Sequence, residues 1–155
     1  METIIFRQLD LNRSRTLQFV SDVTEQQADI VPEGFNNNIR WNLGHILTVQ
    51  ERFAFRLLGE PMDLPEELMS LFGNGTKPAD WQVAPPTLEE LRKLLEEQNE
   101  RFRERLTGRM DDKLQIPFRE LDRLSDVLVF SIGHEALHAG YIQALKRAVA
   151  ASGRS

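Results

Sequence analysis

Apolar side chains recur every three to four residues in four long stretches of the chain, and polar segments separate these stretches. This spacing places side chains on one face of an α-helix. All seven prolines lie between the stretches, as expected because proline cannot continue the hydrogen-bond ladder of a helix. The pattern therefore predicts four helices: about residues 3–24, from Asn36–Asn38 to Leu58, from Thr87 to Gly108, and about residues 122–151.

Capping signals support two of these helix starts. An asparagine at positions 36–38 can accept a hydrogen bond from a free backbone N–H of the second helix, and Thr87 followed by Glu90 fits a capping box at the third. Residues 60–86 hold most of the prolines, which predicts a long crossover loop with one short helix at its apolar piece, Glu66–Phe72. No stretch of useful length alternates as a strand would.

We therefore expect an all-α fold, a four-helix bundle with a long crossover loop after the second helix, in a single domain spanning residues 1–155. The length suits one hydrophobic core, and 41% hydrophobic with 28% charged residues is typical of globular proteins. On the third helix, Glu89 with Lys93 and Glu97 with Arg101 have the four-residue spacing of ion pairs on a solvated face.

Composition and charge exclude several functional classes. The chain has no cysteine, which removes disulfides, thiolate metal ligands and cysteine nucleophiles, and favours the cytoplasm. Its start lacks the features of a signal peptide, and no apolar run is long enough to span a membrane. The net charge is −5 and basic residues are interleaved with acidic ones, so we expect neither nucleic acid nor membrane as a partner.

The three histidines form the most informative pattern in the chain. His134 and His138 are four residues apart and share one helical face, whereas His45 lies beside the inward-facing Ile46. A single core histidine usually hydrogen-bonds to a neighbour and binds nothing. Three imidazoles in one apolar bundle would leave buried polar atoms without partners. They predict one divalent metal ion, zinc, nickel or manganese, with open coordination positions as in catalytic sites.

Two glycines strengthen this expectation. Gly44 and Gly133 directly precede His45 and His134, although a glycine inside a helix costs about 1 kcal/mol relative to alanine. We therefore expect another segment to approach the backbone closely at both positions.

The segment His134–His138 also matches H-E-x-x-H, in which two histidines bind zinc and the glutamate is a general base. The extended metalloprotease pattern needs a third histidine where this chain has Ala144, and no acidic residue follows Glu135. A metalloprotease is therefore disfavoured. Glu135 is a predicted catalytic residue, with a structural carboxylate as the alternative.

The chain resembles the DinB superfamily, the DinB and bacillithiol S-transferase group of metal-binding bundles. The resemblance rests on the total length, on N-I-R-W-N-L-G-H-I at Asn38–Ile46 and on H-E-A-L-H-A-G-Y-I at His134–Ile142. The metal ligands of the family correspond by position to His45, His134 and His138. The resemblance implies a nickel, zinc or manganese ion between the helices, and frequent homodimers.

The resemblance also implies an activity. Characterised members use the ion to activate the sulfur of a low-molecular-weight thiol, such as bacillithiol or mycothiol, for transfer or isomerisation. We accordingly expect a metal-dependent thiol S-transferase in which Glu135 or a metal-bound water manages protons. In the first helix, Asn12, Arg13 and Thr16 lie on roughly the same side as the apolar residues and are a candidate wall for recognising polar groups of the substrate. Arg13 could pair there with a carboxylate, or it could be a surface arginine whose stem lies along the bundle. Two alternatives remain open: a metal-water hydrolase of a small substrate, and a non-catalytic metal-binding stress-response protein.

Overall fold

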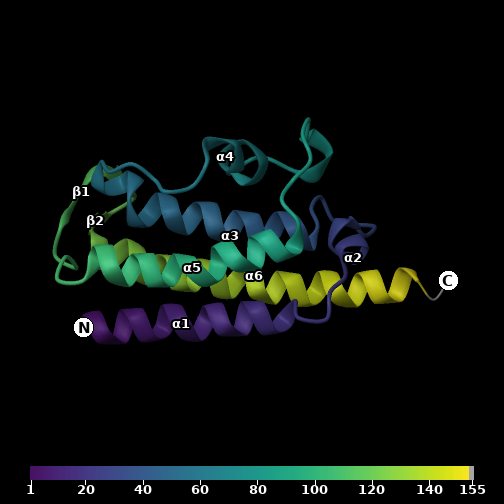
Figure 1. Cartoon of the computed structure of the whole chain (residues 1–155), viewed down its shortest axis with the longest axis horizontal. Helices are drawn as coiled ribbons and strands as arrows, with labels where there is room; N and C mark the ends of the chain where they lie inside the picture. The colour runs from purple at the N-terminus through teal and green to yellow at the C-terminus, as the bar shows by residue number, and fades with distance from the viewer. Residues whose placement is uncertain (154–155) are drawn as a thin grey trace.

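Four long helices lie side by side along the long axis of the molecule (Figure 1). The computed structural model describes residues 1–153. Its long helices are α1 (Glu2–Phe19), α3 (Ile39–Ala54), α5 (Leu88–Leu106) and α6 (Leu124–Ser152). The expected all-α four-helix bundle is thus confirmed.

Short elements connect the long helices. They are α2 (Glu25–Asp29), the 3₁₀ turn η1 (Arg56–Leu58), α4 (Glu66–Phe72), the 3₁₀ turn η2 (Pro78–Asp80) and the strands β1 (Lys113–Phe118) and β2 (Leu121–Arg123). None of the described helices is long and apolar enough to cross a membrane.

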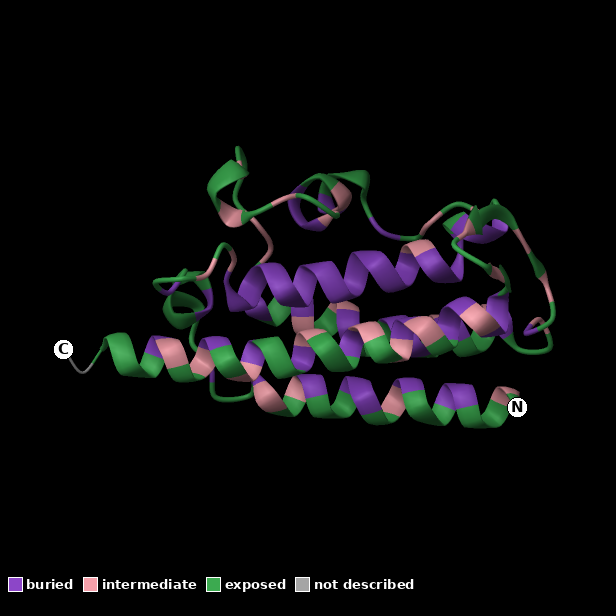
Figure 2. Ribbon diagram, turned by 180° about the vertical axis from the view of Figure 1, so that it is seen from behind, coloured by how far each residue is buried: buried purple, intermediate pink, exposed green. Residues whose placement is uncertain are grey.

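Helix α3 occupies the centre of the molecule. Every residue of α3 except Arg52 is buried, and buried residues run almost unbroken along it in Figure 2. It is in contact with α6, α5 and α4, so neighbours cover most of its circumference. A side chain on α3 therefore points into the protein at nearly every position, and this includes His45.

The observed caps explain where the helices begin. The side chain of Asn38 accepts a hydrogen bond from the backbone N–H of Trp41 and caps α3, while Thr87 and Glu90 form the expected capping box at α5. The first helix is shorter than expected because it ends at Phe19, and Thr24 then starts α2 with a capping box of its own.

A small antiparallel hairpin between α5 and α6 differs from the sequence expectation of no strand. Strand β1 pairs with β2 in a register that places Phe118 opposite Leu121. The Phe118 ring lies 4.8 Å from that of Phe53 and 5.2 Å from that of Phe130, between ring centroids. The hairpin has only a few partly buried side chains. Its apolar pattern is therefore too short to be recognised without the core that it covers.

The connection between α3 and α5 contains α4 at the predicted residues, Glu66–Phe72. Two tryptophans hold this connection in place through hydrogen bonds. Trp41 of α3 donates from Nε1 to Thr76 Oγ1 at 2.9 Å, which fixes the connection to the bundle. Trp81 donates from Nε1 to the carbonyl of Leu71 at 2.8 Å, which joins two parts of the connection. As a result, α4 is held against α3 next to His45.

Neither predicted ion pair of α5 forms among the described residues. Lys93 pairs with Glu97 at 3.9 Å on the exposed face, in place of Glu89, and Arg101 reaches across to the fully buried Glu51 at 2.8 Å. A buried carboxylate needs a charged or hydrogen-bonding partner much more than an exposed one does, so tertiary packing overrides the spacing along α5.

Candidate metal centre

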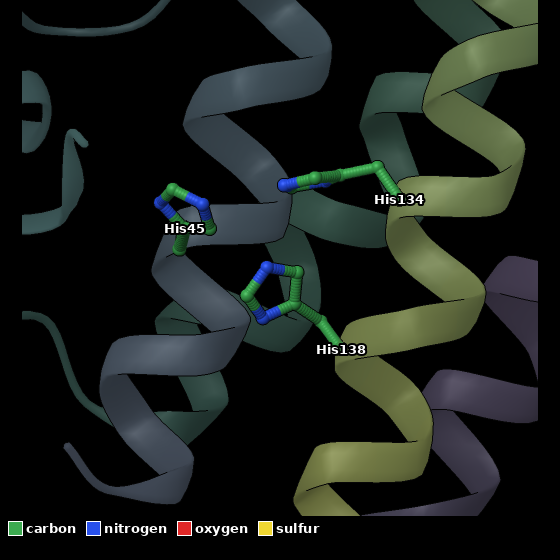
Figure 3. Close-up of side chains that lie close together, drawn as sticks. All are labelled: His45, His134 and His138. Atoms are coloured by element: carbon green, nitrogen blue, oxygen red, sulfur yellow. The ribbon is translucent and has the colours of Figure 1, made fainter. Parts of the chain in front are cut away.

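The fold brings the three histidines together. His45 extends from α3, and His134 and His138 extend from successive turns of α6 (Figure 3). Their ring centroids lie 4.5–5.1 Å apart, and one nitrogen from each ring lies within 4.8 Å of the others. His45 is buried and the other two are half-buried. Among the described residues, this is the group of histidine and acidic side chains that could hold a metal ion.

The end of α4 orients His45. Its Nδ1 lies 2.7 Å from the carbonyl oxygen of Phe72, the last residue of α4. The last carbonyls of a helix have no partner within the helix, so this oxygen is free to accept. Since a carbonyl cannot donate, Nδ1 carries the proton. Nε2 of His45 is thereby left with the lone pair that a metal requires.

Asn42 orients His138 in the same way. The Nδ1 of His138 lies 2.8 Å from Oδ1 of Asn42. The amide nitrogen of Asn42 donates to Asn37 Oδ1 at 3.0 Å and to the carbonyl of Asn38 at 2.8 Å, which fixes the direction of the amide. Asn42 Oδ1 is therefore the acceptor, and Nε2 of His138 is also free to bind a metal.

The donors present fit a divalent ion. The Nδ1 atom of His134 is buried and has no hydrogen-bond partner in the part of the chain that the structure describes, and such an atom costs about 1–3 kcal/mol. An ion bound through it would remove this cost. Three neutral imidazoles are also the protein ligands of catalytic zinc sites such as that of carbonic anhydrase.

Burial keeps these rings neutral. It lowers the pKa of His138 to about 3, helped by the charges of His134 and His45. Burial and the charge of His45 lower the pKa of His134 to about 4, against an opposing effect of Glu135. Burial also lowers the pKa of His45. At pH 7 all three rings therefore present unprotonated nitrogen, as metal binding demands.

These shifts predict an acid-sensitive apoprotein. Between about pH 4 and pH 6.5 the unfolded chain binds more protons than the folded one at His134, so the free energy of unfolding should fall as the pH falls. Urea unfolding of the metal-free protein at pH 7 and pH 5 measures this. The variant His134→Gln should lose less stability than the wild type over the same range, and an equal loss would contradict the assignment.

A single glycine permits the contact between α3 and α4. A Cβ atom on Gly44 would lie 2.3–2.5 Å from ring carbons of Phe72, so only glycine leaves room for that ring. The expected close approach is confirmed at Gly44. It is wrong at Gly133, where a Cβ would meet nothing within 4 Å.

Replacing Gly44 with alanine should therefore displace Phe72 and the carbonyl that orients His45. Overpacking of this kind costs about 1–3 kcal/mol, and metal affinity should fall with it. Urea unfolding and metal titration test both effects. The double variant Gly44→Ala/Phe72→Leu should recover part of the stability because the smaller side chain can move away. If Phe72→Leu restored no stability to Gly44→Ala, the loss would not come from a clash with the Phe72 ring.

Asn42 is the orienting residue that sequence reasoning missed. The variant Asn42→Ala leaves Nδ1 of His138 without its acceptor and should weaken metal binding about 10–100-fold. Competition titration with a chelator measures the affinity. Asn42→Asp keeps an acceptor oxygen and should bind more tightly than Asn42→Ala. If the wild type and Asn42→Ala bound metal with equal affinity, Asn42 would not be a residue that orients His138 for metal binding. The sequence places Asn42 three residues before His45 on the same helix face, but this spacing gives no sign of the contact with His138.

Glu135 lies in a buried polar network. It is fully buried, and its oxygens accept from Arg13 Nε at 2.9 Å and from Gln50 Nε2 at 2.7 Å. The Arg13 guanidinium also donates to Gln98 Oε1 and to the carbonyl of Leu95. Arg13 is only 3% exposed, so the interpretation of it as an open wall for substrate carboxylates is wrong.

The aromatic residues near the histidines have different roles. Trp41 is buried and stacks on His45 with ring centroids 4.5 Å apart and planes 13° apart. Tyr141 lies one turn beyond His138 and is 39% exposed. Its ring meets that of Phe35 in a T-shaped arrangement with the ring centroids 5.6 Å apart. Trp41 thus packs against His45, whereas Tyr141 reaches the surface.

Together, the bundle and its three inward-facing imidazoles define a helical protein with a possible metal site. The model of the DinB superfamily matches residues 8–142. The chain belongs to this superfamily. The crystal structure of a conserved protein from Enterococcus faecalis is similar in fold, with a TM-score of 0.72 and 15% identity over 97% of this chain and 98% of that one. A comparison with curated proteins finds no match.

Proposed function

We propose that this protein is a metal-dependent enzyme that activates a low-molecular-weight thiol for S-transfer at His45, His134 and His138. The observation that carries the proposal is the orientation of the rings. Oxygen acceptors hold the Nδ1 protons of His45 and His138, which leaves Nε2 of each ring free for an ion. Neutral rings and membership of the DinB superfamily support the same conclusion.

One zinc, nickel or manganese ion held there would lower the pKa of a coordinated thiol. The protein contributes the three ligands and leaves the other coordination positions to substrate, since the group of possible ligands among residues 1–153 holds three side chains. His45 and its stacked Trp41 close the inner side of the centre. A small substrate would approach from the side of His134 and His138, because these two rings are only half-buried.

Glu135 remains a proposed catalytic residue. One variant tests whether it is a general base or only positions α6. Its oxygens already accept from Arg13 and Gln50, which favours positioning of α6 and of the adjacent His134. If Glu135 is a general base, Glu135→Gln should lower turnover about 10²–10⁴-fold while metal content is unchanged. If it only positions α6, the same variant should lower the free energy of unfolding, and turnover per bound metal should change little.

The proposed activity is tested by loading the purified protein with Co²⁺ or Ni²⁺ and titrating bacillithiol. We expect about one ion per chain and a change in the metal absorption spectrum when thiol binds, and the variant His45→Ala should show neither. The hydrolase would be supported instead if no thiol changed the absorption spectrum of the metal-loaded protein and the protein hydrolysed small esters, amides or epoxides. A protein that binds metal without any turnover would support the non-catalytic alternative.

We place this activity in the cytoplasm, on the basis of the cysteine-free composition. We also propose that the functional form is a homodimer, as the family resemblance implies.

A further inference from the structure

Arg52 is the exception on the central helix α3. It is the one residue of α3 that is not buried, and its side chain makes no hydrogen bond or ion pair with any residue that the structure describes. Every other buried or partly buried lysine or arginine among residues 1–153 donates to an oxygen, as Arg101 does to Glu51. A partly buried guanidinium group without an acceptor is unfavourable, so an acceptor from outside the chain would stabilise it.

Arg52 shares a helix face with His45. The two are seven residues apart, which is almost two full turns and brings Arg52 back to within about 20° of the direction of His45. The separation along the axis is about 10 Å at 1.5 Å per residue. Because the Cβ atoms of a helix tilt toward its N-terminus, the long side chain of Arg52 leaves the helix in the direction of His45. Its guanidinium group is therefore within reach of a small molecule held at the three histidines.

A cluster of three aromatic rings lies at the same end of the centre. Helices α3 and α6 run in opposite directions (Figure 1), so the part of α3 after its histidine lies beside the part of α6 before its two histidines. The rings of Phe53, Phe118 and Phe130 meet there with centroids 4.8–5.7 Å apart. Phe53 directly follows Arg52, and Phe130 lies one turn before His134. Since Phe118 and Phe130 are only partly buried, the cluster offers an apolar surface between the arginine and the histidines.

Arg119 adds a second guanidinium group at this cluster. Its Cζ lies 5.5 Å from the ring centroid of Phe130 and 5.7 Å from that of Phe118, and cation–π attraction favours this position. The side chain forms no ion pair within the described part of the chain, not even with the adjacent Glu120. The backbone of Arg119 has a φ of 55°, in the left-handed region that favours glycine. An arginine thus occupies a position that suits a smaller residue, and its charge is available to a ligand.

We propose that Arg52, assisted by Arg119, binds a carboxylate group of the thiol whose sulfur is activated at the metal centre. This inference rests on the proposed function, and it narrows the substrate to thiols that carry a carboxylate several bonds from the sulfur. A guanidinium group binds a carboxylate through two parallel hydrogen bonds, and Phe118 and Phe130 provide a surface for the apolar spacer between the two ends. The role that the sequence suggested for the enclosed Arg13 falls to two arginines that remain accessible.

Two thiols that differ only in charge test the carboxylate site. Mercaptohexanoate and its methyl ester are titrated into the Co²⁺-loaded protein, and the metal absorption spectrum reports binding of the sulfur. We expect the acid to bind about 10-fold more tightly than the ester, as hydrogen bonds to a charged group should produce. Arg52→Gln should remove most of this preference by weakening only the acid, and Arg52→Lys should retain part of it. Arg119→Gln should reduce the preference by a smaller factor.

Arg15→Gln is the matched control. Arg15 is exposed on α1 and also lacks a partner among the described residues, but α1 provides no residue of the centre. This variant removes the same charge and should keep the full preference for the acid. All four variants should hold as much metal as the wild type, because none of them changes a histidine. A wild type with equal affinity for the acid and the ester, or an undiminished preference in Arg52→Gln, would overturn the proposal.

A measurement without metal separates this proposal from the proposed function. Hexanoate, which has no sulfur, is titrated into the metal-free, isotope-labelled protein while the backbone amide signals are followed by NMR. We expect shifts at Arg52 and Arg119 that the variant Arg52→Gln abolishes. If hexanoate produces these shifts but no thiol changes the metal spectrum, the carboxylate site holds and the S-transfer activity fails. If thiols bind to the metal without preference for the acid and hexanoate shifts no signal, the carboxylate site fails and the proposed function holds.

Discussion

Replacing His138 with alanine is expected to abolish stoichiometric metal binding. The wild type should hold about one ion per chain after dialysis against a metal buffer, and the variant should hold almost none. The loss has two causes: one of the three proposed ligands is removed, and Asn42 no longer orients any ring. We expect the affinity to fall at least 100-fold, which exceeds the 10–100-fold typical of losing an outer partner. Elemental analysis of the purified, untagged proteins measures the content.

Tyr141→Phe provides the matched control for this experiment. Tyr141 lies one turn further along α6 and is partly exposed, so removal of its hydroxyl should leave the metal content unchanged. If His138→Ala contained as much metal as the wild type, the proposed three-histidine centre would be wrong. A wild type that cannot be loaded at all would instead make the histidines structural and exclude the metal-dependent enzyme.

The variant Arg13→Leu is expected to be the most destabilising single change. It leaves the fully buried Glu135 without the guanidinium that it accepts from at 2.9 Å. Removing one partner of a buried ion pair costs about 3–5 kcal/mol, which is a large share of the about 5–15 kcal/mol that stabilises a typical domain. Urea unfolding of the metal-free protein at pH 7 measures the free energy of unfolding.

The double variant Arg13→Leu/Glu135→Leu shows whether the loss comes from the pair itself. It should be less destabilised than the two single variants added together, by up to about 3 kcal/mol of coupling, since no unpaired charge remains buried. Lys93→Ala is the control, because its pair with Glu97 is exposed and should contribute no more than about 1 kcal/mol. Strictly additive losses would mean that Arg13 and Glu135 stabilise the bundle independently.

The buried network also explains why two polar residues of α1 were misinterpreted. Periodicity placed Asn12 and Arg13 on the inner side of the first helix, and the structure buries both. Only the tertiary contacts reveal what they meet there. Arg13 is enclosed by α3, α5 and α6 through Gln50, Gln98 and Glu135, and no pattern within α1 could identify partners from three other helices.

Local sequence signals determined the secondary structure well where the stabilising interaction is itself local. Asn38 and Thr87 cap their helices through neighbouring backbone groups, and the apolar stretch Glu66–Phe72 forms a helix of those residues. The hairpin at Lys113–Arg123 was missed because its side chains gain their burial from residues of other elements: Phe53 in the distant α3 and Phe130 in the α6 helix that follows.

By itself, the sequence determined the helical bundle and predicted which three histidines lie together in the candidate centre. Helical periodicity and the four-residue spacing of His134 and His138 are properties of single helices. The tertiary structure alone decided how the centre is oriented. The carbonyl of Phe72 lies 27 residues from His45, and Asn42 lies 96 residues from His138. Such contacts depend on how α4 and α6 pack against α3, and this packing is set by the whole core, so no local pattern encodes it.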